Sequence, residues 1–212
     1  MTHPTPEHPT LEQLEAGLPA IQEAPRDAGS LEMIVRRPEV GAREVLESGE
    51  LDPQVGLRGD TWNVRASSKM PDRSPHPGRQ ITLMASRVIS LVARDRDRWP
   101  LAGDQLFVDL DLSTDNLPAG TRLALGDAVL EITDQLHTGC KKFHQRFGAD
   151  ALRFVAHPSR RGMNLRGVYA KVVQPGAIRV GDRVEKLEGS PGARQDSQSP
   201  NPDEAAGLRA GR

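Results

Sequence analysis

Short runs of alternating apolar residues, separated by glycine and proline, constrain the fold of this chain more than any other feature. Such runs occur at residues 31–35, 43–46, 80–84, 106–112, 122–125, 128–133, 168–173 and 183–187. Gly126 and Asp127 lie between two of the runs and predict a tight hairpin turn. Helical spacing is rarer, at residues 86–99, 140–147 and 149–155, with stop signals at Pro100 and Gly148. We therefore expect a mainly β protein, a β-barrel with a few short peripheral α-helices.

The two ends of the chain differ in composition from its middle. Residues 1–29 are rich in Pro, Glu and Gln, and a short amphipathic piece at Leu11, Leu14 and Leu18 predicts a loose helix. Residues 189–212 hold almost no apolar side chains and so cannot repay the entropy of ordering. We expect a flexible N-terminal segment at 1–29, one folded domain at 30–188 and a disordered tail at 189–212.

Composition argues against several classes of function. The net charge is −1 and only 3% of residues are aromatic, so we expect no nucleic-acid partner, which would need stacking platforms. No apolar run approaches the roughly 20 residues of a membrane span, and the N-terminus lacks the apolar core of a secretion signal. Cys140 is the only cysteine, which fits a reducing compartment. We expect a cytoplasmic protein without a membrane partner.

Cys140 lies where a strand-like stretch gives way to a helical one, and Lys141 and Lys142 follow it directly. With Thr138 as the N-cap, the cysteine falls in the first helical turn, where the helix dipole and adjacent cations favour a thiolate. A thiolate there would serve as a nucleophile, a persulfide carrier or a metal ligand. The opposing interpretation is a small buried hydrophobic residue, since free cysteine is among the most buried residue types.

Basic residues gather around this cysteine. Residues 139–167 hold seven Lys or Arg and one acid, whereas the rest of the chain holds 21 basic and 28 acidic residues. A basic segment in an otherwise acidic chain is typical of an anion-binding site, although solvated helix faces give the same pattern. Glycine follows arginine at Arg161-Gly162 and at Arg166-Gly167, and such pairs let a backbone approach a phosphate-sized ligand.

Other kinds of site find little support in the sequence. The six histidines show no zinc-ligand spacing, among themselves or with Cys140. The sequence contains no P-loop, nucleophile elbow or dinucleotide fingerprint. Asp60 and Asp109 are better interpreted as turn and barrel-rim carboxylates than as proton carriers.

Several motifs, in this order, resemble one family. They lie at residues 56–60, 103–106, 125–133, 138–143, 166–172 and 176–184. Over about residues 31–187 the chain resembles the MOSC domain, the C-terminal domain of molybdenum cofactor sulfurase. That domain also occurs in the mitochondrial amidoxime-reducing component and in small stand-alone bacterial proteins.

The resemblance implies a β-rich barrel that binds the molybdenum cofactor, with Cys140 as the molybdenum ligand and catalytic residue. From charge and placement, the candidates for holding the pterin phosphate are Lys141, Lys142, Arg161, Arg166 and Gly167. The implied activity is that of an oxidoreductase on small N-hydroxylated or N-oxygenated compounds.

Electrons would come from a separate donor protein, because the chain shows no flavin, haem or iron–sulfur motif. The pyridoxal-dependent domain of the larger relatives is missing, so no pyridoxal phosphate is expected. Two alternatives stay open: a persulfide or cofactor carrier without turnover of its own, and a barrel without any site.

Overall fold

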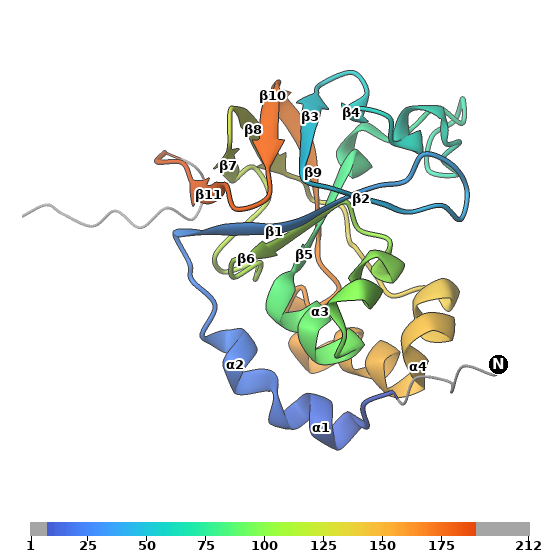
Figure 1. Ribbon diagram of the computed structural model, residues 1–212, viewed down its shortest axis with the longest axis vertical. Helices are drawn as coiled ribbons and strands as arrows, with labels where there is room; N and C mark the ends of the chain where they lie inside the picture. The colour runs from blue at the N-terminus through green and yellow to red at the C-terminus, as the bar shows by residue number, and fades with distance from the viewer. Residues whose placement is uncertain (1–7, 190–212) are drawn as a thin grey trace, which may run out of the picture.

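The computed structural model describes residues 8–189 and centres on a closed barrel of seven strands (Figure 1). The strands are β1 (Ala28–Arg36), β5 (Ile81–Ala85), β6 (Leu106–Asp109), β7 (Arg122–Leu125), β8 (Ala128–Ile132), β9 (Val168–Gln174) and β11 (Arg183–Lys186). Their order around the barrel is β11-β7-β8-β9-β5-β6-β1, and pairing of β1 with β11 closes it. The mainly β prediction and the β7–β8 hairpin at Gly126 and Asp127 are therefore confirmed.

The connection from β5 to β6 is a crossover between neighbouring parallel strands. Strands β5 and β6 pair in parallel, so the chain must return over the barrel between them. The return runs through helix α3 (Ser86–Ala93) and the 3₁₀ helix η3 (Arg96–Ala102), which ends at Gly103 with φ of +89°. This turn into β6 forms part of the candidate site.

A second, small sheet lies at the opposite end of the barrel from the helices (Figure 1). Its order is β10 (Gly176–Arg179), β3 (Ser48–Asp52) and β4 (Gly56–Leu57). Strand β2 (Glu44–Leu46) extends the barrel sheet beside β1. After β4 come the 3₁₀ helices η1 (Thr61–Val64) and η2 (Pro77–Arg79), which frame one side of the site.

The remaining helices gather at the other end. Helix α4 (Lys141–Val155) is broken at Gly148, whose φ of +88° is not helical, so the predicted stop at this glycine is confirmed. The 3₁₀ helix η4 (Pro158–Met163) follows it. Helices α1 (Leu11–Ala16) and α2 (Leu18–Gln22) occupy part of the segment expected to be flexible, and Leu14 of α1 is fully buried. The predicted tail at 189–212 lies outside the described residues, except for Gly189.

The core is mostly aliphatic, as expected from the low aromatic content, and all four phenylalanines are buried in it. Three of these, Phe143, Phe147 and Phe154, lie on α4 and bury that helix against α1, α3 and η3. None of the helices within residues 8–189 has the length and apolarity that crossing a bilayer would require.

Candidate functional site

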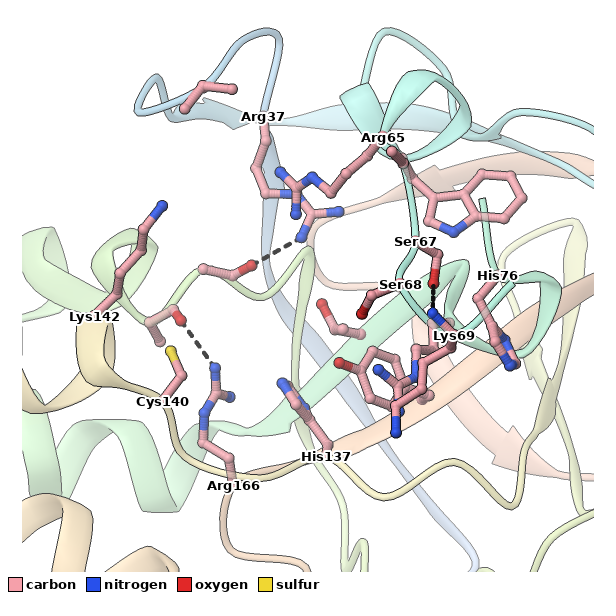
Figure 2. A pocket seen from close by; sticks show the side chains of 18 of the residues that line it. Arg37, Arg65, Ser67, Ser68, Lys69, His76, His137, Cys140, Lys142 and Arg166 are labelled. Atoms are coloured by element: carbon pink, nitrogen blue, oxygen red, sulfur yellow. Dashed lines mark hydrogen bonds between the residues drawn. The ribbon is translucent and has the colours of Figure 1, made fainter. Parts of the chain in front are cut away.

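A cavity of about 520 Å³ opens beside the amino end of α4 (Figure 2). Its wall is built from the loop after β1, the segment from η1 to η2, the turn between η3 and β6, the start of α4 and the start of β9. Eight cationic side chains line it and no carboxylate does, and we call it the cationic pocket. The eight are Arg37, Arg43, Arg65, Lys69, Arg79, Lys142, Arg146 and Arg166.

The turn at 101–103 fixes three of these arginines. Three successive backbone carbonyls of the turn each accept a hydrogen bond from a different guanidinium. Arg146 donates to the Leu101 carbonyl at 2.6 Å, Arg166 to that of Ala102 at 3.0 Å, and Arg37 to that of Gly103 at 3.1 Å. The three arginines come from α4, from the turn before β9 and from the end of β1, so this short turn holds together elements that are distant in sequence.

Two buried carboxylates lie behind the pocket wall. Asp104 is fully buried and accepts from Arg166 Nη1 at 2.7 Å. Asp60 accepts from Arg37 through both of its oxygens, each at 2.7 Å, and also caps η1. Burial raises the pKa of Asp104, and the charge of Arg166 opposes this rise. These pairs compensate two of the eight pocket cations.

The other six cations form no ion pair within residues 8–189; they are Arg43, Arg65, Lys69, Arg79, Lys142 and Arg146. Burial and the charges of Arg146 and Arg37 lower the pKa of Arg43. Burial and the charge of Arg37 likewise lower the pKa of Arg65. The pocket therefore concentrates positive charge that the described residues do not neutralise, and a negatively charged ligand would be stabilised there.

His137 lies between the two walls of the pocket, with a side chain that is 9% exposed. Its Nδ1 is 3.6 Å from Asp104 Oδ1, and neither atom has a hydrogen-bond partner among the described residues. Its ring lies 4.5 Å from that of Tyr169. Burial, and then the charges of nearby arginines, lower the pKa of His137 well below its usual value, so the imidazole is neutral at neutral pH.

Cys140 is exposed and lines the cationic pocket, so the interpretation as a buried hydrophobic residue is wrong. The predicted helix start is also wrong by two residues. Cys140 itself is the N-cap: its backbone is extended at φ −127° and ψ 170°, and its carbonyl accepts the first helical hydrogen bond, from His144 N–H at 3.1 Å. Gly139 packs directly on Leu152, and a Cβ added at position 139 would collide with the Leu152 side chain.

The candidates from the basic segment fall into two sets. Lys142 and Arg166 line the pocket together with Cys140. Lys141 and Arg161 are exposed and do not line it. Gly167 lies behind the wall, where its φ is +101° and an added Cβ would collide with the Leu83 carbonyl, so its role is the close approach of β9 to β5.

Several pocket residues escaped the sequence analysis. Arg37 and Arg43 come from an acidic stretch, where no local excess of charge marks them. Arg65, Lys69 and Arg79 lie within residues 61–94, which hold six Lys or Arg and one acid, and this excess is a signal that could have found them. Arg146 and Asp104 each had a signal, since the first lies in the basic segment and the second in a motif of the resemblance.

The two acids expected to be rim carboxylates both lie in ion pairs. Asp60 pairs with Arg37 behind the pocket wall, and Asp109 pairs with Arg87 at 2.6 Å. Neither lines the pocket.

Comparison with known proteins fits this architecture. The family model described as MOSC domain matches residues 76–185, which is more than half of the chain. The chain therefore belongs to the MOSC domain family. A search of curated proteins found no match.

Two solved structures share the fold. The YuaD protein from Bacillus subtilis is 18% identical, with a TM-score of 0.57 over 75% of this chain and 95% of that one. A protein described as hypothetical is 16% identical, with a TM-score of 0.51 over 82% of this chain and 71% of that one. At such identities the likeness establishes the fold alone.

Proposed function

We propose that the cationic pocket binds the molybdenum cofactor, with Cys140 as the metal ligand and the pocket cations around the pterin phosphate. The observation that carries the proposal is that the single thiol of the chain is exposed on the wall of a pocket with eight cations and no carboxylate. A thiolate is a soft ligand suited to such a metal, and guanidinium groups bind phosphate strongly.

The residues present fit this group. No set of three or more His, Cys, Asp or Glu side chains within residues 8–189 could hold a metal ion, so Cys140 is a lone soft donor. A metal bound there would have to arrive with ligands of its own, as the pterin cofactor provides. The volume of about 520 Å³ lies in the range of small-molecule sites. The buried Nε atoms of Arg43 and Arg166 lack partners, which leaves donors for an acceptor on a ligand.

The reaction that we propose is reduction of a small N-hydroxylated or N-oxygenated compound. The cofactor, when bound, supplies the redox chemistry. The protein contributes binding and orientation: Lys142 and Arg166 attract the phosphate, and the turn at 101–103 holds Arg166 and Arg146 in place. Neutral His137 offers a nitrogen that accepts a proton or a hydrogen bond near Cys140. Electrons come from a separate donor protein, and the unpaired thiol suits the reducing cytoplasm.

Metal and pterin analysis tests the proposal. Wild type, Cys140→Ser and Lys142→Gln are purified from a host that makes the cofactor, and molybdenum and pterin are measured per chain. We expect about one of each in wild type, loss of molybdenum in Cys140→Ser, and reduced pterin in Lys142→Gln. Lys141→Gln is the matched control, because it removes the same charge one residue outside the pocket.

The same samples separate a carrier from a redox enzyme. A persulfide carrier would show a mass gain of one sulfur on Cys140 and neither molybdenum nor pterin. Wild type without metal, pterin or added sulfur would contradict both functions and leave only the fold.

A further inference from the structure

The pocket cations fall into two groups on either side of His137. Cys140, Lys142 and Arg166 lie on one side, whereas Lys69 and His76 lie on the other (Figure 2). Arg79 joins the second group, since its guanidinium lies 5.3 Å over the Tyr169 ring. We call Lys69 and Arg79 the outer cations.

The outer cations share one environment. Arg65 lies apart from them, since its side chain extends toward that of Arg37 (Figure 2) and its charge lowers the pKa of Arg43. Neither of the outer cations forms an ion pair within residues 8–189. Ser67 and Ser68 line the same wall, and Ser67 Oγ accepts from the Lys69 backbone N–H at 3.2 Å. Hydroxyls beside uncompensated cations are the donors that phosphate and carboxylate groups use.

One phosphate monoester does not account for this much charge. After Asp60 and Asp104 compensate two arginines, six pocket cations remain without an ion pair in the described part of the chain. A phosphate monoester carries about −1.5 to −2 at neutral pH. Lys142, Arg146 and Arg43, on the side of Cys140, already exceed that charge. The outer cations are therefore surplus to the cofactor phosphate.

The outer group also has a different origin in the chain. Ser67, Ser68 and Lys69 precede the segment that matches the family model, which begins at residue 76. Cys140, Lys142 and Arg166 lie within it. The half of the pocket that holds the thiol therefore belongs to the matched domain, and most of the outer half is contributed by the preceding segment of this chain.

We infer that Lys69 and Arg79, with Ser67 and Ser68, form a second anion subsite, and that the substrate of the pocket is an organic anion bearing a phosphate or a carboxylate. The acidic group binds to the outer cations, and the rest of the molecule extends past His137 toward Cys140. That the bound anion is a substrate rests on the proposed function. The anion subsite itself is defined by the charges and is tested separately.

Titration with inorganic phosphate and with acetate tests the subsite by calorimetry at low salt. The proteins are wild type, the double variant Lys69→Gln with Arg79→Gln, and Arg153→Gln, which removes an exposed charge of α4 outside the pocket. We expect the double variant to bind phosphate at least about tenfold more weakly, because it loses two cationic hydrogen-bond donors to the anion. Arg153→Gln should bind as wild type does. Tighter acetate than phosphate binding would assign the subsite to a carboxylate.

Pterin content distinguishes this inference from the proposed function. We expect the double variant to retain as much pterin as wild type. If wild type proves free of pterin, the proposed function fails, but loss of phosphate affinity in the double variant still supports the subsite. Two results overturn the inference: unchanged phosphate affinity in the double variant, or a loss of pterin from it, which would show that one ligand spans both groups. The melting temperature of the double variant, measured beside that of wild type, checks that the lost affinity does not reflect unfolding.

Discussion

Replacing Asp104 with asparagine removes a carboxylate from a fully buried position beneath the cationic pocket. Its partner Arg166 is 5% exposed, lies 4.9 Å from the Phe143 ring, and keeps only the Ala102 carbonyl and an amide oxygen as acceptors. Breaking a buried ion pair by removing one partner costs about 3–5 kcal/mol, because the other charge stays buried without compensation. We expect about 3 kcal/mol, since asparagine keeps the shape and one acceptor.

Urea unfolding followed by circular dichroism measures this loss of unfolding free energy. The matched control is Glu44→Gln, which breaks the exposed Arg36–Glu44 pair, whose side chains are 35% and 45% exposed. It should cost less than about 1 kcal/mol. The double variant Asp104→Asn with Arg166→Met should recover part of the loss, because it removes the stranded charge together with its partner. Equal losses in Asp104→Asn and Glu44→Gln would refute the argument.

Three further predictions concern the thiol, a glycine and the buried imidazole. Cys140 should react with the dianionic disulfide dithiobis(nitrobenzoate) about tenfold faster at low than at high salt, whereas a neutral dithiodipyridine should show little salt dependence; equal dependence would contradict steering by the pocket cations. Gly167→Ala should lower the unfolding free energy by about 3 kcal/mol in urea, because its φ is positive and the new Cβ meets the Leu83 carbonyl; a neutral result would mean that this backbone relaxes freely. Because burial lowers the pKa of His137, the unfolded chain takes up a proton first as the pH falls, so stability should drop below about pH 6.5 by up to about 1.4 kcal/mol per pH unit. The His137→Gln variant should lack that slope in urea titrations, and an identical slope would assign it to other groups.

The sequence predicted the barrel strands because each carries apolar residues that the barrel buries, at alternate positions in β8 and β9 and at every position in β5. Strands β3 and β10 escaped prediction for the opposite reason: Leu51 is the one buried side chain of β3, and Ile178 is that of β10. The predicted strand at 106–112 ends at Asp109, although Leu110 and Leu112 are buried, because the chain leaves the sheet there for a loop.

The site was predictable only in part, because charge patterns along a sequence show local neighbours. Lys142 and Arg166 were found beside Cys140 since all three lie within one basic segment. Arg37 comes from an acidic stretch far earlier in the chain and Arg65 from a separate basic one, and only closure of the barrel brings them to the thiol. Even within the basic segment, composition could not distinguish Lys142 from Lys141, since that depends on which way each residue of a helical turn faces.

The turn at 101–103 has a consequence for any attempt to redesign this protein. A one-residue insertion there would shift three guanidinium groups in concert and misalign them relative to the thiol. The segment at 65–69 has no such tie to the turn, so its charges can be exchanged singly while the thiol side keeps its alignment. New ligand specificity is therefore best engineered in that segment, with the backbone at 101–103 left unchanged.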